Sequence, residues 1–297
     1  MSSRNQPPSQ AVANLPVFET LGAAFIAVVG QPVLLLRAMA GGLMLLAVAA
    51  IIFVALPNAL TGMLAIFAPL AAYSHFGVNW YRILLLGPAG LVRPTLRWDR
   101  RHWYFFGYSL ALGSVLLVIY LAVTTLVPVL PGAVVAVALW YLAARCCFLF
   151  PTIAVQEPYS FALAWQHTRG QGLRLTAALL IAAIPLYLTV SLIVSLVVFA
   201  TMGDAFTALM ELQGRGGFDP ESTESTEAFA EAVAAIPPVT LISVKMIFEA
   251  LTMVVLAVLF GIVALAFRTC TGWVPDGSGN LPSAPGEDDD SDDPQAR

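Results

Sequence analysis

Long apolar runs separated by short polar breaks dominate this sequence. Six of them are nearly free of charge, and they cover about 33–56, 60–86, 102–127, 130–150, 173–201 and 239–267. Each run provides about the 20 residues that a helix needs to cross a hydrocarbon core. The runs are continuous, whereas the strands of a membrane barrel alternate apolar and polar positions. The pattern therefore predicts an all-α integral membrane protein with about six transmembrane helices in three hairpins.

Two shorter segments are predicted to be interfacial helices. Residues 18–30 are apolar but too few to span, and Gln31-Pro32 ends them. Residues 159–168 place aromatic and polar side chains on opposite faces, as a helix on a membrane surface does. A further short helix is predicted at 228–236, in the acidic stretch before the last run.

Composition supports a membrane protein and adds disordered ends. The chain is 59% hydrophobic and 11% charged, whereas soluble domains carry about 25% charged residues. The polar residues 1–17 and the tail 271–297, with its acidic run at 287–293, are expected to be disordered. No basic patch of the kind that binds nucleic acid is present, so no nucleic-acid partner is expected.

The basic residues predict the orientation in the membrane. With six spans and both termini on one side, 12 of the 14 Lys and Arg residues fall on that side or at its span ends. Only Arg215 and Lys245 fall on the other side. Positive residues are enriched on the cytoplasmic side of membrane proteins, so both termini are predicted to be cytoplasmic.

Lys245 and Glu249 form the most specific candidate site. They stand four residues apart and so share one face of the last span. Glu249 lies roughly 15 Å into that span, where an unpaired carboxylate costs on the order of 3 kcal/mol. It must be neutral, paired with Lys245 or facing a polar interior. A structural ion pair and a role in transport, with Ser191 and Ser195 lining a path, both stay open.

The connector at 145–175 between the fourth and fifth runs holds the second candidate. Its polar and aromatic residues of interest are Arg145, Glu157, Trp165, Arg169 and Arg174. Tryptophan at headgroup depth beside arginine is typical of a membrane surface. One interpretation is a face for lipid headgroups or a partner protein, with Glu157 pairing with the arginines. The other is an anchor that orients the helices.

Known catalytic and cofactor motifs are missing from the sequence. It has no Gly-rich phosphate loop, HExxH or GxSxG pattern. His75, His102 and His167 have no i,i+4 partner and no acid or cysteine at ligand spacing, so a zinc site is not expected. We expect no cofactor and no enzymatic activity.

The connector also carries a resemblance. Arg145, Phe148–Pro151 and Ile153–Val155, followed by Phe161, Ala164, Trp165, Thr168, Arg169 and Gly170, resemble a broad set of uncharacterised bacterial inner-membrane proteins. Trp80-Tyr81-Arg82 and the Trp98–Trp103 loop look like the same group. The chain is also distantly similar to the membrane domain attached to some glycerophosphodiester phosphodiesterases. The resemblance implies a six-span helical fold in the bacterial inner membrane, without the catalytic domain.

Two functions remain open at this point. The first is a non-enzymatic scaffold, regulator or lipid-organising protein, with membrane lipids and another inner-membrane protein as candidate partners. The second is a small transporter or permease subunit that uses Lys245 and Glu249.

Overall fold

The computed structural model describes residues 14–56, 58–88, 98–126, 132–214 and 236–275, and every regular element in these ranges is a helix. The helices are α1 (Val17–Gly30), α2 (Pro32–Ala55), α3 (Ala59–Leu86), α4 (Arg100–Leu126), α5 (Gly132–Cys146), α6 (Leu149–Val155), α7 (Phe161–His167), α8 (Gly172–Gly214) and α10 (Pro238–Thr271). The predicted all-α class is confirmed. The predicted helix at 228–236 lies almost wholly outside the described residues.

Local sequence explains where several helices begin and end. Proline occupies the first position of α2 and of α10, where its missing N–H costs no helical hydrogen bond. Asn58 caps α3 in a reciprocal capping box with Thr61. At the other end of α10, Gly272 adopts a φ of 66° and its N–H bonds back to Arg268, a left-handed turn that favours glycine.

Among the described residues, six apolar helical stretches are long enough to cross a membrane. Five of them are α2, α3, α4, the first 30 residues of α8, and α10. The sixth, Gly132–Val155, is not one straight helix, because α5 ends at Cys146 and α6 begins at Leu149. The fourth predicted span at 130–150 therefore contains a break.

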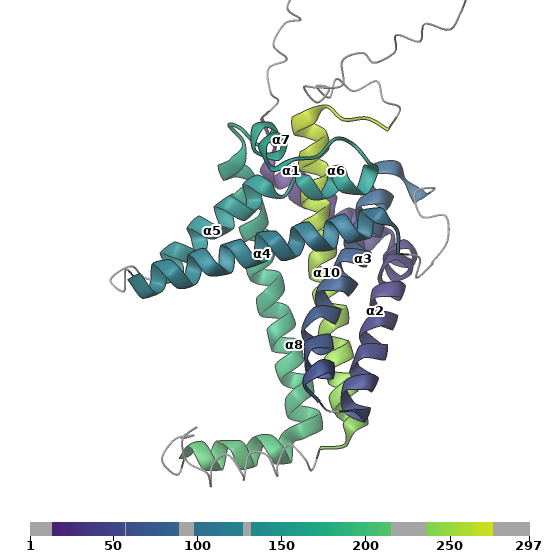
Figure 1. Ribbon diagram of the computed structural model, residues 1–297, viewed down its shortest axis with the longest axis vertical. Coiled ribbons are helices and arrows are strands. Elements are labelled where there is room, and N and C mark those ends of the chain that lie inside the picture. The colour runs from purple at the N-terminus through teal and green to yellow at the C-terminus, as the bar shows by residue number, and fades with distance from the viewer. Residues whose placement is uncertain (1–13, 57, 89–97, 127–131, 215–235, 276–297) are drawn as a thin grey trace, which may run out of the picture.

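Four long helices, α2, α3, α8 and α10, run side by side and form the body of the molecule (Figure 1). The most apolar stretch of α10 is the most deeply buried of the six, and α10 packs against α2, α3, α8 and α1. The Trp80 indole of α3 is fully buried and donates to the Ala257 carbonyl of α10 at 2.9 Å. Gly42 of α2 lies so close to α3 that a Cβ would come within 2.8 Å of the Ala72 carbonyl oxygen.

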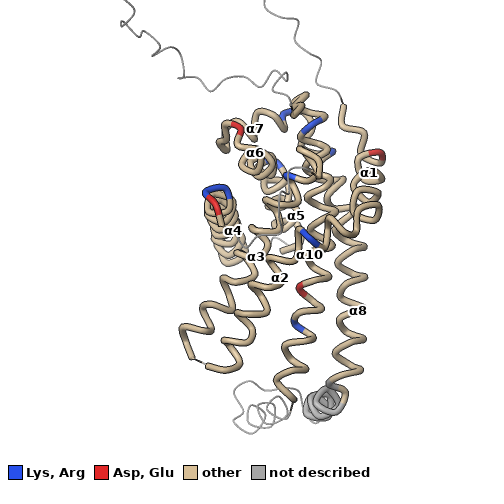
Figure 2. Tube along the Cα trace, turned by 90° about the vertical axis from the view of Figure 1, so that its right-hand side faces the viewer, with Lys and Arg blue, Asp and Glu red and all other residues tan. Residues whose placement is uncertain are grey.

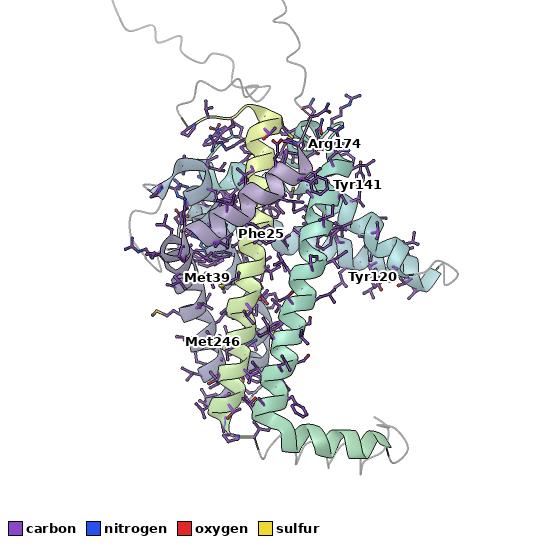
Figure 3. All side chains as sticks on the ribbon, turned by 180° about the vertical axis from the view of Figure 1, so that it is seen from behind. Phe25, Met39, Tyr120, Tyr141, Arg174 and Met246 are labelled. Atoms are coloured by element: carbon purple, nitrogen blue, oxygen red, sulfur yellow. The ribbon has the colours of Figure 1, made fainter. Side chains whose placement is uncertain are left out.

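The α4–α5 hairpin does not join this parallel arrangement. It runs crosswise to α8 and α10 and projects from one side of the body in Figure 1, and α4 is seen nearly end-on after a quarter turn in Figure 2. Its first part packs on α3 and α6, and α5 returns to α8. Tyr120, near the far end of α4, lies well away from the four-helix body (Figure 3).

The described ends of the chain lie at the same end of the molecule as α6 and α7 (Figure 1). There α1, one of the two predicted interfacial helices, lies across α10 and α8 (Figure 3). Two residues that the sequence assigns to disordered ends are packed here. Leu15 is 2% exposed and donates its N–H to the Gln171 side chain, and Trp273 is 4% exposed.

Candidate functional site

The predicted Lys245–Glu249 pair is present and gains a third member from another helix. The Lys245 ammonium donates to Glu249 Oε1 at 3.0 Å, and the Tyr73 hydroxyl of α3 donates to Glu249 Oε2. The Glu249 side chain is 3% exposed, whereas that of Lys245 is 41% exposed. Both carboxylate oxygens thus have a donor, which is what a buried carboxylate requires.

A further polar group of α10 lies beside this pair. The Tyr73 hydroxyl also forms a hydrogen bond with the Thr252 side chain. Thr252 is itself buried and donates to the Phe248 carbonyl of its own helix at 2.9 Å. The pair is therefore part of a small polar cluster on two helices, α3 and α10, rather than an isolated contact along α10.

An apolar cavity of about 360 Å³ opens beside Lys245 between α2, α3 and α10. Its walls consist of Leu46, Ala49, Ala50, Phe53 and Val54 of α2, Ala65, Ala68 and Pro69 of α3, and Leu241, Ile242 and Lys245 of α10. Small-molecule sites are typically apolar cavities of this size with a few polar groups that fix orientation. The Lys245 ammonium is the one charged group in this wall, and two of its three N–H donors remain after the bond to Glu249.

The position of this cavity separates it from the arginines. Met246, the neighbour of Lys245, lies in the half of α10 remote from Arg174 and the connector (Figure 3). The cavity suits a ligand with an apolar chain, and the Lys245 side chain suits a hydrogen-bond acceptor on the same ligand. A lipid combines an apolar chain with such an acceptor.

A second cavity of about 330 Å³ lies between α5 and α8. It is lined by Trp140, Tyr187 and Ser191 together with Leu180, Ala183, Ile184 and Leu188. The indole N–H of Trp140 is buried and has no hydrogen-bond partner among the described residues. Ser191, predicted to line a path, does line this cavity, whereas Ser195 is absent from the lining of both cavities.

The connector is organised by Arg145, which turns inward. Its guanidinium donates to Thr168 Oγ1 at 2.8 Å, the Tyr141 hydroxyl at 3.1 Å and the Trp165 carbonyl at 2.7 Å. It also stacks 3.9 Å from the centre of the Trp165 ring. Because Arg145 is only 8% exposed and three of its N–H groups are satisfied by neutral partners, it holds α5 to α7 rather than a headgroup.

The other connector residues do not converge on one site. Glu157 accepts a hydrogen bond from the Trp273 indole at 3.0 Å. Arg169 and Arg174 are exposed, and neither forms an ion pair with Glu157 within the described part of the chain. The predicted pairing of Glu157 with these arginines is therefore wrong. Arg169 and Arg174 remain as the two exposed cations of the predicted face.

Sequence reasoning missed a histidine cluster where α4 begins. The His75 and His102 rings stack with centroids 5.0 Å apart, and His102 Nδ1 lies 2.7 Å from Asp99 Oδ1. Burial alone would raise the pKa of Asp99, but His102 and Arg101 hold that pKa below its usual value. Asn79 bonds His75 one turn along α3. The spacing of Asp99 and His102, three residues apart, was the available signal.

Within the described ranges no three His, Cys, Asp or Glu side chains are arranged to hold a metal ion. A scan of protein-family models and searches of curated proteins and of solved structures find no match to this chain.

Proposed function

We propose that this protein is a non-enzymatic protein of the bacterial inner membrane that binds and organises lipid, with both termini in the cytoplasm. The observation that carries the proposal is the apolar cavity with Lys245 in its wall. The exposed Arg169 and Arg174 at the opposite end add a surface suited to anionic headgroups. The arginine-rich end is assigned to the cytoplasm because positive residues favour that side.

Retained lipid provides the test. The full chain is extracted directly into native-lipid nanodiscs, and the bound lipid is measured by mass spectrometry after washing. Ala50→Phe fills the cavity with a ring, and Val48→Phe adds the same ring on an exposed position of the same helix. We expect Ala50→Phe to lose a stoichiometric lipid that both wild type and Val48→Phe retain.

Testing the contribution of Lys245 requires a variant that does not leave the buried Glu249 carboxylate without its partner. Lys245→Met with Glu249→Gln removes the ammonium and the carboxylate together, which avoids the cost of an unpaired ion. We expect this variant to keep its folded yield and to retain less of the lipid, because the N–H donor for an acceptor on the lipid is gone. Equal retention in wild type, Ala50→Phe and the double variant would refute lipid binding at the cavity.

A transporter role is the second candidate, and the Tyr73–Glu249–Lys245 cluster is the observation that favours it. Glu249→Gln distinguishes the two functions because it removes the ionisable group with little change in shape. Lipid retention should survive this substitution. Proton- or ion-coupled flux in proteoliposomes would be abolished by it, and flux that depends on Glu249 would replace the first proposal with the second.

A further inference from the structure

The α5 helix is too short to cross a membrane. It has 15 residues from Gly132 to Cys146, which corresponds to about 22 Å at 1.5 Å per residue, against a hydrocarbon core of about 30 Å. The chain then breaks at Cys147 and Phe148 before α6 begins. Arg145, held by Thr168 and Trp165, fixes the end of α5 next to α7, so α5 cannot be extended in that direction.

The α4 helix is long enough to span the membrane, but its axis is not aligned with the other long helices. Its 27 residues correspond to about 40 Å. A helix of that length crosses a core of about 30 Å only if it is tilted by less than about 40° from the membrane normal. Figures 1 and 2 show α4 lying crosswise to α8 and α10. When the four-helix body stands along the normal, α4 runs close to the membrane plane.

The outer part of α4 is exposed and apolar around its full circumference. In the most apolar stretch of α4 no residue is buried in the protein. The consecutive residues at 117–121 are all at least 36% exposed, and at about 100° per residue they cover the full circumference of the helix. A helix resting on a membrane surface has a polar face, and residues 103–126 contain no charged residue at all.

Charged groups occur only at the root of the hairpin within its described residues. Asp99, Arg100 and Arg101 precede or open α4, and Arg145 closes α5. Arg100 is exposed and donates to the Tyr104 hydroxyl at 2.7 Å. The root packs on α3 and α6, at the end of the body that carries the connector. Headgroups at that level would meet the charged root, while the rest of the hairpin would meet acyl chains.

We propose that the α4–α5 hairpin is embedded in the single leaflet on the arginine-bearing side, that its described residues beyond the charged root lie among the acyl chains of that leaflet, and that it does not reach the opposite face. The angle between α5 and α8 then holds lipid, and the cavity of about 330 Å³ with the Trp140 indole lies in that angle. Because the hairpin starts and ends on one side, the two described ends of the chain remain on the same side.

Water access at the hairpin tip tests this placement. Single-cysteine variants are made in the full chain after Cys146, Cys147 and Cys270 are replaced by alanine, and elution as a single folded peak is required. Thr125→Cys lies exposed in the last turn of α4. In lipid nanodiscs both faces are open to a charged maleimide, which reacts only where water allows the thiolate to form.

Three matched positions calibrate the labelling. Ala59→Cys lies at the α2–α3 turn on the far face, and Thr269→Cys lies at the arginine end of α10. Leu188→Cys is at a position that is 66% exposed in the middle of α8 and faces lipid. We expect Thr125→Cys to react as slowly as Leu188→Cys, at least about tenfold slower than the two aqueous positions, because thiolates do not form in hydrocarbon.

A thiol shielded by protein would also react slowly with maleimide, so the depth of position 125 in the membrane is measured as well. A membrane-permeant fluorophore on Thr125→Cys should be quenched more by lipids labelled along the acyl chain than by lipids labelled at the headgroup. Rapid maleimide reaction at Thr125→Cys would show that the tip emerges into water, and it would overturn the proposal. Stronger quenching by headgroup-labelled lipids would overturn it as well.

Discussion

Tyr73→Phe removes one oxygen atom from the interior of the helix body and leaves the ring in place. That hydroxyl donates to Glu249, whose side chain is 3% exposed, so water cannot replace the lost donor. A hydrogen bond to a charged group contributes about 1.5–3 kcal/mol. We therefore expect Tyr73→Phe to lower stability by about 2 kcal/mol, which corresponds to a fall of about 3 °C in Tm for a chain of 297 residues.

A double-mutant cycle isolates the contact. Thermal unfolding is followed by the fraction of monodisperse protein that remains after heating, in wild type, Tyr73→Phe, Glu249→Gln and the double variant. A neutral amide accepts a weaker hydrogen bond, worth about 1 kcal/mol, so Tyr73→Phe should cost about half as much in the Glu249→Gln background. Tyr120→Phe on the projecting part of α4 is the matched control. Equal costs of Tyr73→Phe in both backgrounds would refute the hydrogen bond to an ionised Glu249.

Two further predictions concern the connector. A Cβ at Gly172 would lie 2.4 Å from Arg145 Cδ, so Gly172→Ala should lower Tm by displacing the guanidinium, at a cost of about 1–3 kcal/mol. Gly113→Ala, which meets nothing within 4 Å, should leave Tm unchanged or raise it slightly. Arg169→Ala with Arg174→Ala should reduce anionic lipid retained in nanodiscs, since each arginine contributes about 1 kcal/mol near such a surface. Unchanged lipid composition would exclude a headgroup role for this face.

Contacts along one helix could be predicted from the sequence, whereas contacts between helices could not. Lys245 and Glu249 are four residues apart, and helix geometry alone brings their side chains together. Tyr73 reaches the same carboxylate from a position 176 residues away. The packing of α3 on α10 includes a close approach of Gly77 to the Phe260 ring, which no spacing rule encodes.

The orientation of a helix in the membrane could likewise not be predicted from the sequence. An apolar run of 24 or more residues predicts a helix in hydrocarbon, and the apolar helices of the structure agree with that. Hydropathy carries no information on tilt, however, because a helix in the membrane plane and a helix across the membrane need the same apolar surface. The break at Cys147 and the inward turn of Arg145 set the direction of the hairpin, and the latter depends on Thr168, 23 residues farther along the chain.

Lys245 and Arg145 are compensated in opposite ways. Lys245 meets a carboxylate, so its site is neutral overall and can lie within the hydrocarbon. Arg145 contacts the hydroxyls of Thr168 and Tyr141 and the carbonyl and ring of Trp165. All of these groups are neutral, so the positive charge of the site is not neutralised. An uncompensated charge is tolerable only where counter-ions are close. The partners of Arg145 therefore favour a position of the connector at the headgroups, and the partners of Lys245 favour a position of the cavity within the acyl chains.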